Sequence, residues 1–283
     1  MTDYDVAAQP QGFSLHTVVG DEDGPPGELP TGLLHRRLGD DVPEVRHPLN
    51  LIDYVDLSSP APPPAVHRSH LEHKFPMDGN DRLGDCGPVM VAHGIEAFHL
   101  DEKTPVPQMT EEDVIDWYSI IGGYEPGNPS SDGGVNNTTL IEKWQAGLKA
   151  AGLDHTIKAS AYIDPHNVSL NERAIWEFVV LFRAAGLPIS AQGQSKWEVT
   201  DPSLQGEAEP GSWGGHDIPY LSYDGKWYRC VTWEKGLLLS YDWDAAYALE
   251  GFVVVTDEML GSRGGTSPAG FKWDQLIHDC EHL

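Results

Sequence analysis

The spacing of apolar residues changes near residue 75 and divides the chain into an irregular first quarter and a patterned remainder. Residues 1–74 show no sustained helical or strand period, and they hold ten of the 22 prolines. Because proline fixes φ and lacks a backbone donor, this segment favours neither a long helix nor a central strand. We predict an extended N-terminal arm (1–74) that wraps its own domain or reaches a neighbour, with short elements near Leu33 and over 49–55.

The first part of the patterned region predicts helices. Residues 86–100 repeat apolar side chains at helical spacing. Thr110, which three acidic residues follow, is a good N-cap for a helix that ends at Ile121. Capping boxes that begin at Thr139 and Ser169 predict two further helices. The expected helices therefore cover 86–100, 111–121, 140–151 and 170–186.

After Gly186 the pattern becomes typical of strands. Residues 187–192 predict one strand, and residues 216–233 predict a hairpin around Asp224-Gly225, a dipeptide that hairpin turns favour. Two more strands (235–241 and 251–257) flank a short helix. Helices followed by an antiparallel sheet indicate the α+β class. The last residues form a predicted tail (258–283), helical near Trp273 to His278.

Composition excludes several classes of protein. The 283 residues, 40% of them hydrophobic, suffice for a folded domain with a core. A formal charge of −26 argues against a broad basic nucleic-acid surface, and it favours solubility or docking to a basic partner. The sequence contains no apolar run of membrane length, and acids stand where a signal peptide needs basic residues. We expect synthesis in a host cytoplasm and no contact with membrane or nucleic acid.

Three cysteines, widely spaced, form neither a disulfide framework nor a metal-binding pattern. We therefore expect a reducing compartment and no metal or cofactor. Cys86 differs from the other two because it directly precedes the apolar helix. A thiol at a helix N-terminus feels the positive end of the dipole, which favours the thiolate, and nearby N–H groups can stabilise an oxyanion. The structural alternative is a buried, inert cysteine.

His216 follows Cys86 by 130 residues and opens a predicted strand, after two glycines. This order and separation are typical of papain-type enzymes, in which the imidazole takes the thiol proton and later protonates the leaving group. The structural alternative is a histidine that only packs.

Several segments together carry a family resemblance: GNDRLGDC, GGYEPGNPSSDGG, GSWGGHDIPYLSYDG and CVTWEKGLLLSYDW. In this order they resemble a group of papain-like proteins, with a cysteine-peptidase fold, that is common in phages and prophages of actinobacteria. The resemblance covers about 75–258. It implies a domain (75–257) with a helix-rich half, the cysteine at a helix N-terminus, packed on an antiparallel sheet half.

Transferred by motif, the resemblance makes Cys86 the nucleophile and His216 the base. Asn80 falls where papain-like enzymes keep an amide that donates to the oxyanion. The third position departs from the family pattern, because Val231 and Thr232 occupy the stretch where an Asn or Asp orients the imidazole. Glu234 and Asp242 are substitutes only if the loop bends.

Two functions remain open at this point. One is a structural protein of a phage virion, in the capsid, its decoration or the tail, anchored to other virion proteins through the arm. The arm, the acidic surface and the missing third residue favour it. The other is an active cysteine peptidase or amidase that cuts a peptide in the cell wall or in a phage precursor, favoured by the Cys86–His216 pair. We place the structural role slightly ahead.

Overall fold

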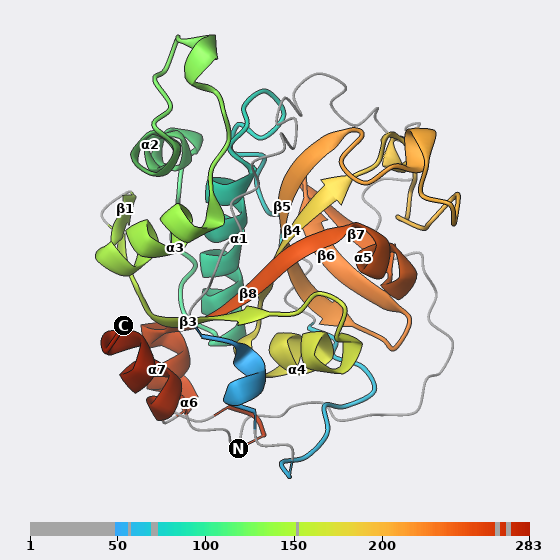
Figure 1. The fold of residues 1–283 in the computed structure, drawn as a ribbon. Helices are drawn as coiled ribbons and strands as arrows, with labels where there is room; N and C mark the ends of the chain where they lie inside the picture. The colour runs from blue at the N-terminus through green and yellow to red at the C-terminus, as the bar shows by residue number, and fades with distance from the viewer. Residues whose placement is uncertain (1–48, 56–57, 69–72, 151–152, 264–266, 270–272) are drawn as a thin grey trace.

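The computed structural model describes residues 49–55, 58–68, 73–150, 153–263, 267–269 and 273–283 (Figure 1). Within these residues the chain forms seven α-helices and eight strands. The helices are α1 (Cys86–Asp101), α2 (Glu111–Gly122), α3 (Asn137–Ala146), α4 (Val168–Phe178), α5 (Tyr241–Tyr247), α6 (Asp257–Arg263) and α7 (Asp274–Glu281). The strands are β1 (Leu148–Ala150), β2 (Leu153–His155), β3 (Ile157–Ile163), β4 (Leu181–Leu187), β5 (Gly214–Tyr223), β6 (Trp227–Thr232), β7 (Lys235–Ser240) and β8 (Ala248–Thr256). Short 3-10 helices lie at Leu51–Asp53, Pro129–Ser131, Ile189–Ala191 and Gly206–Ala208.

Six strands form one antiparallel sheet in the order β3-β8-β4-β5-β6-β7, and β1 and β2 form a separate small pair. Figure 1 shows α1 between this sheet and the pair α2 and α3. The first residues of β5 are therefore brought to the start of α1, where Cys86 lies. The expected α+β architecture, a helical half with the cysteine at a helix start against an antiparallel sheet half, is confirmed.

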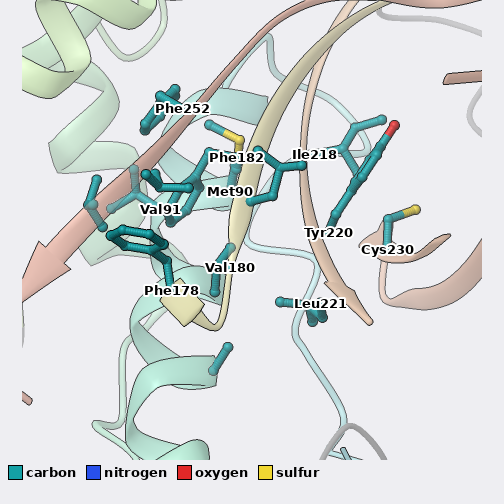
Figure 2. Packing of buried hydrophobic residues seen from close by; sticks show 14 of the residues in the cluster. Met90, Val91, Phe178, Val180, Phe182, Ile218, Tyr220, Leu221, Cys230 and Phe252 are labelled. Carbon is teal, nitrogen blue, oxygen red and sulfur yellow. The ribbon is translucent and has the colours of Figure 1, made fainter. Parts of the chain in front are cut away.

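Helix α1 is buried on nearly all sides, from Gly87 to Phe98. Its small residues let neighbouring elements approach closely, and a Cβ at Gly94 would lie 2.6 Å from the ring of Phe182. Figure 2 shows Met90 and Val91 of α1 in the same cluster as Phe182 of β4 and Ile218 of β5. This packing fixes α1 against the two central strands. No helix in the described residues has the length and apolarity needed to cross a membrane.

The predicted first two helices are confirmed, and Thr110 and Asp113 form a capping box at the start of α2. The prediction for the third helix was wrong at both ends. Asn136, rather than Thr139, is the N-cap, because its side chain accepts from the N–H groups of Thr138 and Thr139. Gly147, with a positive φ of 104°, follows the last helical residue, and β1 begins where the helix was expected to continue.

The predicted helix over 170–186 was also wrong. Asn167 caps α4, which ends at Phe178, and Val179 takes a positive φ of 69°. The apolar residues that follow form β4, one of the two central strands. A strand buried on both faces has a continuous apolar pattern that sequence periodicity does not separate from a buried helix. Strand β3 was missed for the same reason. The strand predicted over 187–192 was wrong, because these residues form only the end of β4 and a 3-10 turn.

The described part of the N-terminal arm packs on the body of its own chain. Leu51 is fully buried, and Val66 forms a β-bridge with Tyr223. The guanidinium of Arg68 donates to the carboxylate of Asp101 and to two backbone carbonyl groups. The predicted short element over 49–55 is confirmed in part by the turn Leu51–Asp53, whereas the one near Leu33 lies outside the described residues.

The C-terminal residues also pack on the body. Trp273 and Leu276 are fully buried, and the Trp273 ring lies 5.9 Å from that of Phe178. Helix α7 confirms the helix expected in this tail.

Candidate functional site

Cys86 is the first residue of α1, and its side chain is partly exposed. Its sulfur lies 3.8 Å from Oδ2 of Asp217, the residue that follows His216 on β5. Gly87 permits this approach, because a Cβ there would lie 2.3 Å from Val135 and 3.2 Å from the Asp217 carboxylate. The glycine after the cysteine is thus required for α1 and β5 to meet at the sulfur.

His216 is held firmly from two sides. Its Nε2 lies 2.7 Å from the Thr232 hydroxyl, and its ring stacks on Trp233 with centroids 4.4 Å apart. The residue is 3% exposed, and in the described part of the chain Nδ1 has no hydrogen-bond partner. Nε2 is therefore hydrogen-bonded, whereas Nδ1 has no hydrogen-bond partner among the described residues.

The tight turn of the β6–β7 hairpin places Trp233 on the imidazole, in a strained backbone conformation. Thr232 pairs with Lys235, so Trp233 and Glu234 form a two-residue turn, and both have positive φ angles of 46° and 59°. Such turns favour Asn and Gly, and larger residues in this region are strained. The indole also donates to the backbone oxygen of Asn80, which ties the turn to the segment before Cys86.

Burial lowers the pKa of His216 to about 3, so the imidazole is neutral at neutral pH. In the tautomer that carries its proton on Nε2, this N–H donates to Thr232, and Nδ1 keeps a free lone pair. That tautomer leaves His216 able to accept a proton at Nδ1.

Thr232 is the imidazole partner that the sequence did not reveal. In the sequence Thr232 is only a departure from the amide or carboxylate expected there, but the structure places its hydroxyl within hydrogen-bonding distance of the ring. Glu234 does not take this role: its exposed side chain lies 4.0 Å from Lys74. Asp242 is exposed in the first turn of α5.

Asn80 is buried beside the start of α1, and its side-chain amide donates to Asp85 at 3.1 Å. An amide nitrogen has two N–H groups, so this bond occupies one of them. Its predicted role as a donor to the oxyanion stays a prediction.

Asp85 precedes Cys86 and has no exposed surface. Burial raises its pKa to about 7, although the Asn80 hydrogen bond acts in the opposite direction. A substantial fraction of this carboxyl group is therefore neutral near neutral pH, which limits its repulsion of a neighbouring thiolate.

A second network joins two of the sequence motifs. One oxygen of Asp132 accepts from the backbone N–H of Gly84 and from the hydroxyl of Tyr118, and that hydroxyl accepts from Gly134. The SSDGG segment thus holds the GDC segment in place. A Cβ at Gly84 would lie 2.9 Å from the same Asp132 oxygen, which explains the glycine.

The structure brings Cys86 to the residue next to His216. Oδ2 of Asp217 lies against the sulfur, and Nε2 of His216, the preceding residue, contacts Thr232 of β6. The catalytic pairing of Cys86 with His216 stays a prediction.

Asp217 beside the cysteine, and two polar residues linked to it, escaped the sequence analysis. The side-chain nitrogen of Asn137, at the start of α3, donates to Asp217 at 3.1 Å and to Glu250 of β8 at 2.7 Å. Asp217 could have been noticed as the residue after His216. Nothing in the sequence indicated Glu250, because only the fold brings β8 next to Asn137.

Among the residues that the structure describes, no group of three or more His, Cys, Asp or Glu side chains is arranged to hold a metal ion.

Comparison with known proteins gives structural matches only. No family model matches the sequence, and no curated protein matches it either. The fold is similar to that of xylellain, a cysteine protease from Xylella fastidiosa, with a TM-score of 0.55 and 12% identity over 72% of this chain and 92% of the other.

A second match is the structure of the cysteine protease and lectin-like domains of Cwp84, a surface layer associated protein of Clostridium difficile. The TM-score is 0.50, with 11% identity over 69% of this chain and 53% of that chain. At these identities the matches show the fold alone. The chain has the fold of the papain-like cysteine proteases, with Cys86 at the start of α1.

Proposed function

We propose that this chain is a papain-like cysteine hydrolase that cleaves an amide bond in a peptide, with Cys86 as nucleophile and His216 as base. The observation that carries the proposal is the state of His216. Its Nε2 is held by Thr232 and its ring by the strained turn, while Nδ1 is buried and has no hydrogen-bond partner among the residues that the structure describes. A neutral imidazole in this state has a lone pair on Nδ1 that can take up a proton.

The chemistry requires no cofactor. The sulfur of Cys86 attacks the carbonyl carbon of the substrate, and its proton passes to Nδ1 of His216. Negative charge then develops on the carbonyl oxygen near the N-terminus of α1, where backbone N–H groups and the second N–H of the Asn80 amide are the candidate donors. His216 returns the proton to the leaving amine, the C–N bond breaks, and water hydrolyses the thioester.

This assignment is tested with the full-length protein and a peptide library made by digestion of a bacterial proteome. New termini found by mass spectrometry identify cleavage. We expect cleavage by the wild type and by Cys280→Ser, and none by Cys86→Ala or His216→Ala. Absence of cleavage by the wild type, or equal cleavage by Cys86→Ala, would contradict the proposal.

One observation favours the second candidate, a structural component of a phage virion. The carboxylate of Asp217 lies 3.8 Å from the sulfur, and a negative charge beside a thiol opposes thiolate formation. In this role an inactive body of this fold is anchored in the capsid, its decoration or the tail through the N-terminal arm (1–74). Mass spectrometry of particles purified from a host that carries this sequence tests this role, and absence of the chain from the particles would exclude it.

A further inference from the structure

The carboxylates beside Cys86 point to the kind of substrate that the site accepts. Asp217 faces the sulfur with Oδ2, and its Oδ1 accepts from the same Asn137 nitrogen that donates to Glu250. Two acidic side chains from different strands thus meet at one amide group, and one of them, Asp217, lies against the nucleophile.

The amide of Asn137 supplies a second, independent observation. Its residue is only 5% exposed, and its Oδ1 is buried without a hydrogen-bond partner in the described part of the chain. Nδ2 donates to both carboxylates, so the orientation of the amide is fixed, because the reverse orientation would set three oxygens against one another. This buried acceptor belongs to the amide that bridges the two carboxylates, and a donor from outside the chain that reached it would be stabilised.

We propose that Asp217, Glu250 and Asn137 form a recognition site for a positively charged group of the substrate, an ammonium or guanidinium on a residue close to the cleaved bond. Both groups carry several N–H donors and no acceptor, which matches a set of oxygens. Glu250 and Cys86 are partly exposed, so the site can be reached from solvent. This inference rests on the proposed hydrolase function.

The position of Asp217 adds a consequence. A bound cation offsets the negative charge of Asp217, and that charge otherwise disfavours the thiolate of Cys86. A cationic substrate residue therefore both binds at the site and assists the attack of the sulfur.

The first test measures the electric field at the sulfur without any need for turnover. Cys86 in a full-length Cys280→Ser background is treated with two methanethiosulfonates, one carrying a trimethylammonium group and one a sulfonate. Each transfers its thioalkyl group to the sulfur as a disulfide and releases methanesulfinate, so the two rates differ through charge. Because Cys230 is fully buried, it serves as the unreactive reference.

We expect the rate ratio of cationic to anionic reagent to fall about tenfold in Glu250→Gln, since one unit of the charge that Asn137 links to Asp217 is removed. Asp217→Asn, which keeps an oxygen for Asn137, should lower the ratio as well. The control Glu142→Gln removes an equal charge from the exposed face of α3 and should leave the ratio within about twofold. An equal ratio in Glu250→Gln, Asp217→Asn and Glu142→Gln would overturn the inference. Thermal unfolding of each variant verifies that it is folded.

The second test separates this inference from the proposed hydrolase function. Matched peptidyl acyloxymethyl ketones, with lysine or the neutral norleucine at each of the three residues on the acyl side, are compared by their rate of Cys86 labelling. Faster labelling by a lysine probe, lost in Glu250→Gln and kept in Glu142→Gln, supports the inference. Labelling without preference overturns the inference alone. No labelling by any probe, with thiosulfonates still reacting, overturns the hydrolase function.

Discussion

At the scale of single residues, the site depends on how one imidazole is held. Thr232 takes the place where papain-like enzymes use an amide or a carboxylate, and its hydroxyl lies 2.7 Å from Nε2 of His216. A hydroxyl can fix the tautomer, but it does not stabilise an imidazolium as a carboxylate does. In the proposed hydrolase Thr232 is therefore a positioning residue, and it suits a histidine whose buried ring is neutral.

Replacement of Thr232 tests this role. Thr232→Val leaves a buried Nε2 unpaired, and we expect kcat to fall about tenfold with KM unchanged, since a lost hydrogen bond of this kind is worth about 1 kcal/mol or more. Thr232→Ser keeps the hydroxyl and should retain most of the rate. Steady-state kinetics on the cleaved peptide measures both variants. Equal rates in Val and Ser variants would show that the hydroxyl does not position the base.

The residue scale also shows what the sequence could reveal. Cys86 and His216 were found because glycines surround them and because their order follows a known pattern. Thr232 was noted but undervalued, since a threonine in a strand is ordinary. Glu250 and Asn137 were missed, because nothing local marks residues that meet only through the fold.

At the scale of elements, the β6–β7 hairpin connects the sheet to the site. Its turn residues Trp233 and Glu234 have left-handed φ angles, which two-residue turns ordinarily assign to Asn and Gly. The turn holds Trp233 between His216 and the backbone of Asn80. We interpret the strain as the energetic cost of placing an indole over the imidazole.

Relief of this strain should stabilise the protein. Glu234→Gly removes a Cβ at a φ of 59°, and we expect the free energy of unfolding to rise by about 1 kcal/mol. The matched control is Glu209→Gly, at a φ of −66°, which should be neutral or destabilising. Urea unfolding followed by tryptophan fluorescence gives both values. A loss of stability in Glu234→Gly would refute the assignment of strain to this residue.

Elements differed in how far the sequence predicted them. Helix α2 carries its own capping box and was predicted correctly, as was the hairpin at Asp224-Gly225. Strand β4 was mistaken for the end of a helix, because its buried apolar run follows α4 after two residues, with Val179 in a left-handed conformation. A β-branched residue gives no sequence signal for such a break.

At the scale of the whole molecule, buried ionisable groups set the dependence of stability on pH. Burial raises the pKa of Asp85 to about 7 and that of Glu96 to about 8. Such groups stabilise the fold fully below their unfolded pKa, and this stability is lost as pH rises through the folded pKa. Burial lowers the pKa of His93 to about 4 and that of His216 to about 3, so stability from these residues is present above about pH 6.5 and is lost as pH falls.

We therefore expect maximal stability near pH 6 and a decline between about pH 6.5 and 8. In this interval only the carboxyl groups with raised pKa values change the free energy of unfolding. The slope predicts a loss on the order of 1 kcal/mol for each group over this interval. Asp85→Asn and Glu96→Gln should each flatten the decline, whereas the exposed Glu209→Gln should not. Tm measured by calorimetry across the pH range reports the effect. A constant Tm from pH 6.5 to 8 would contradict it.

The fold as a whole was predicted from the order of helices before strands and from the resemblance of four motifs. The structure explains why those motifs occur together. Asp132 of one binds Gly84 of another, and Trp233 of the last binds Asn80 of the first. In the sequence these motifs are separate segments. Only the tertiary structure shows that they contact one another.

The most direct test of the account is the pH dependence of Cys86 alkylation by iodoacetamide, with Cys280 of the same protein as an internal reference. If His216 accepts the thiol proton, Cys86 reacts at least about tenfold faster than Cys280 at pH 6, and His216→Ala removes the difference. A rate for Cys86 that follows an ordinary thiol curve, and that is the same in His216→Ala, would contradict the assignment of these two residues as nucleophile and base.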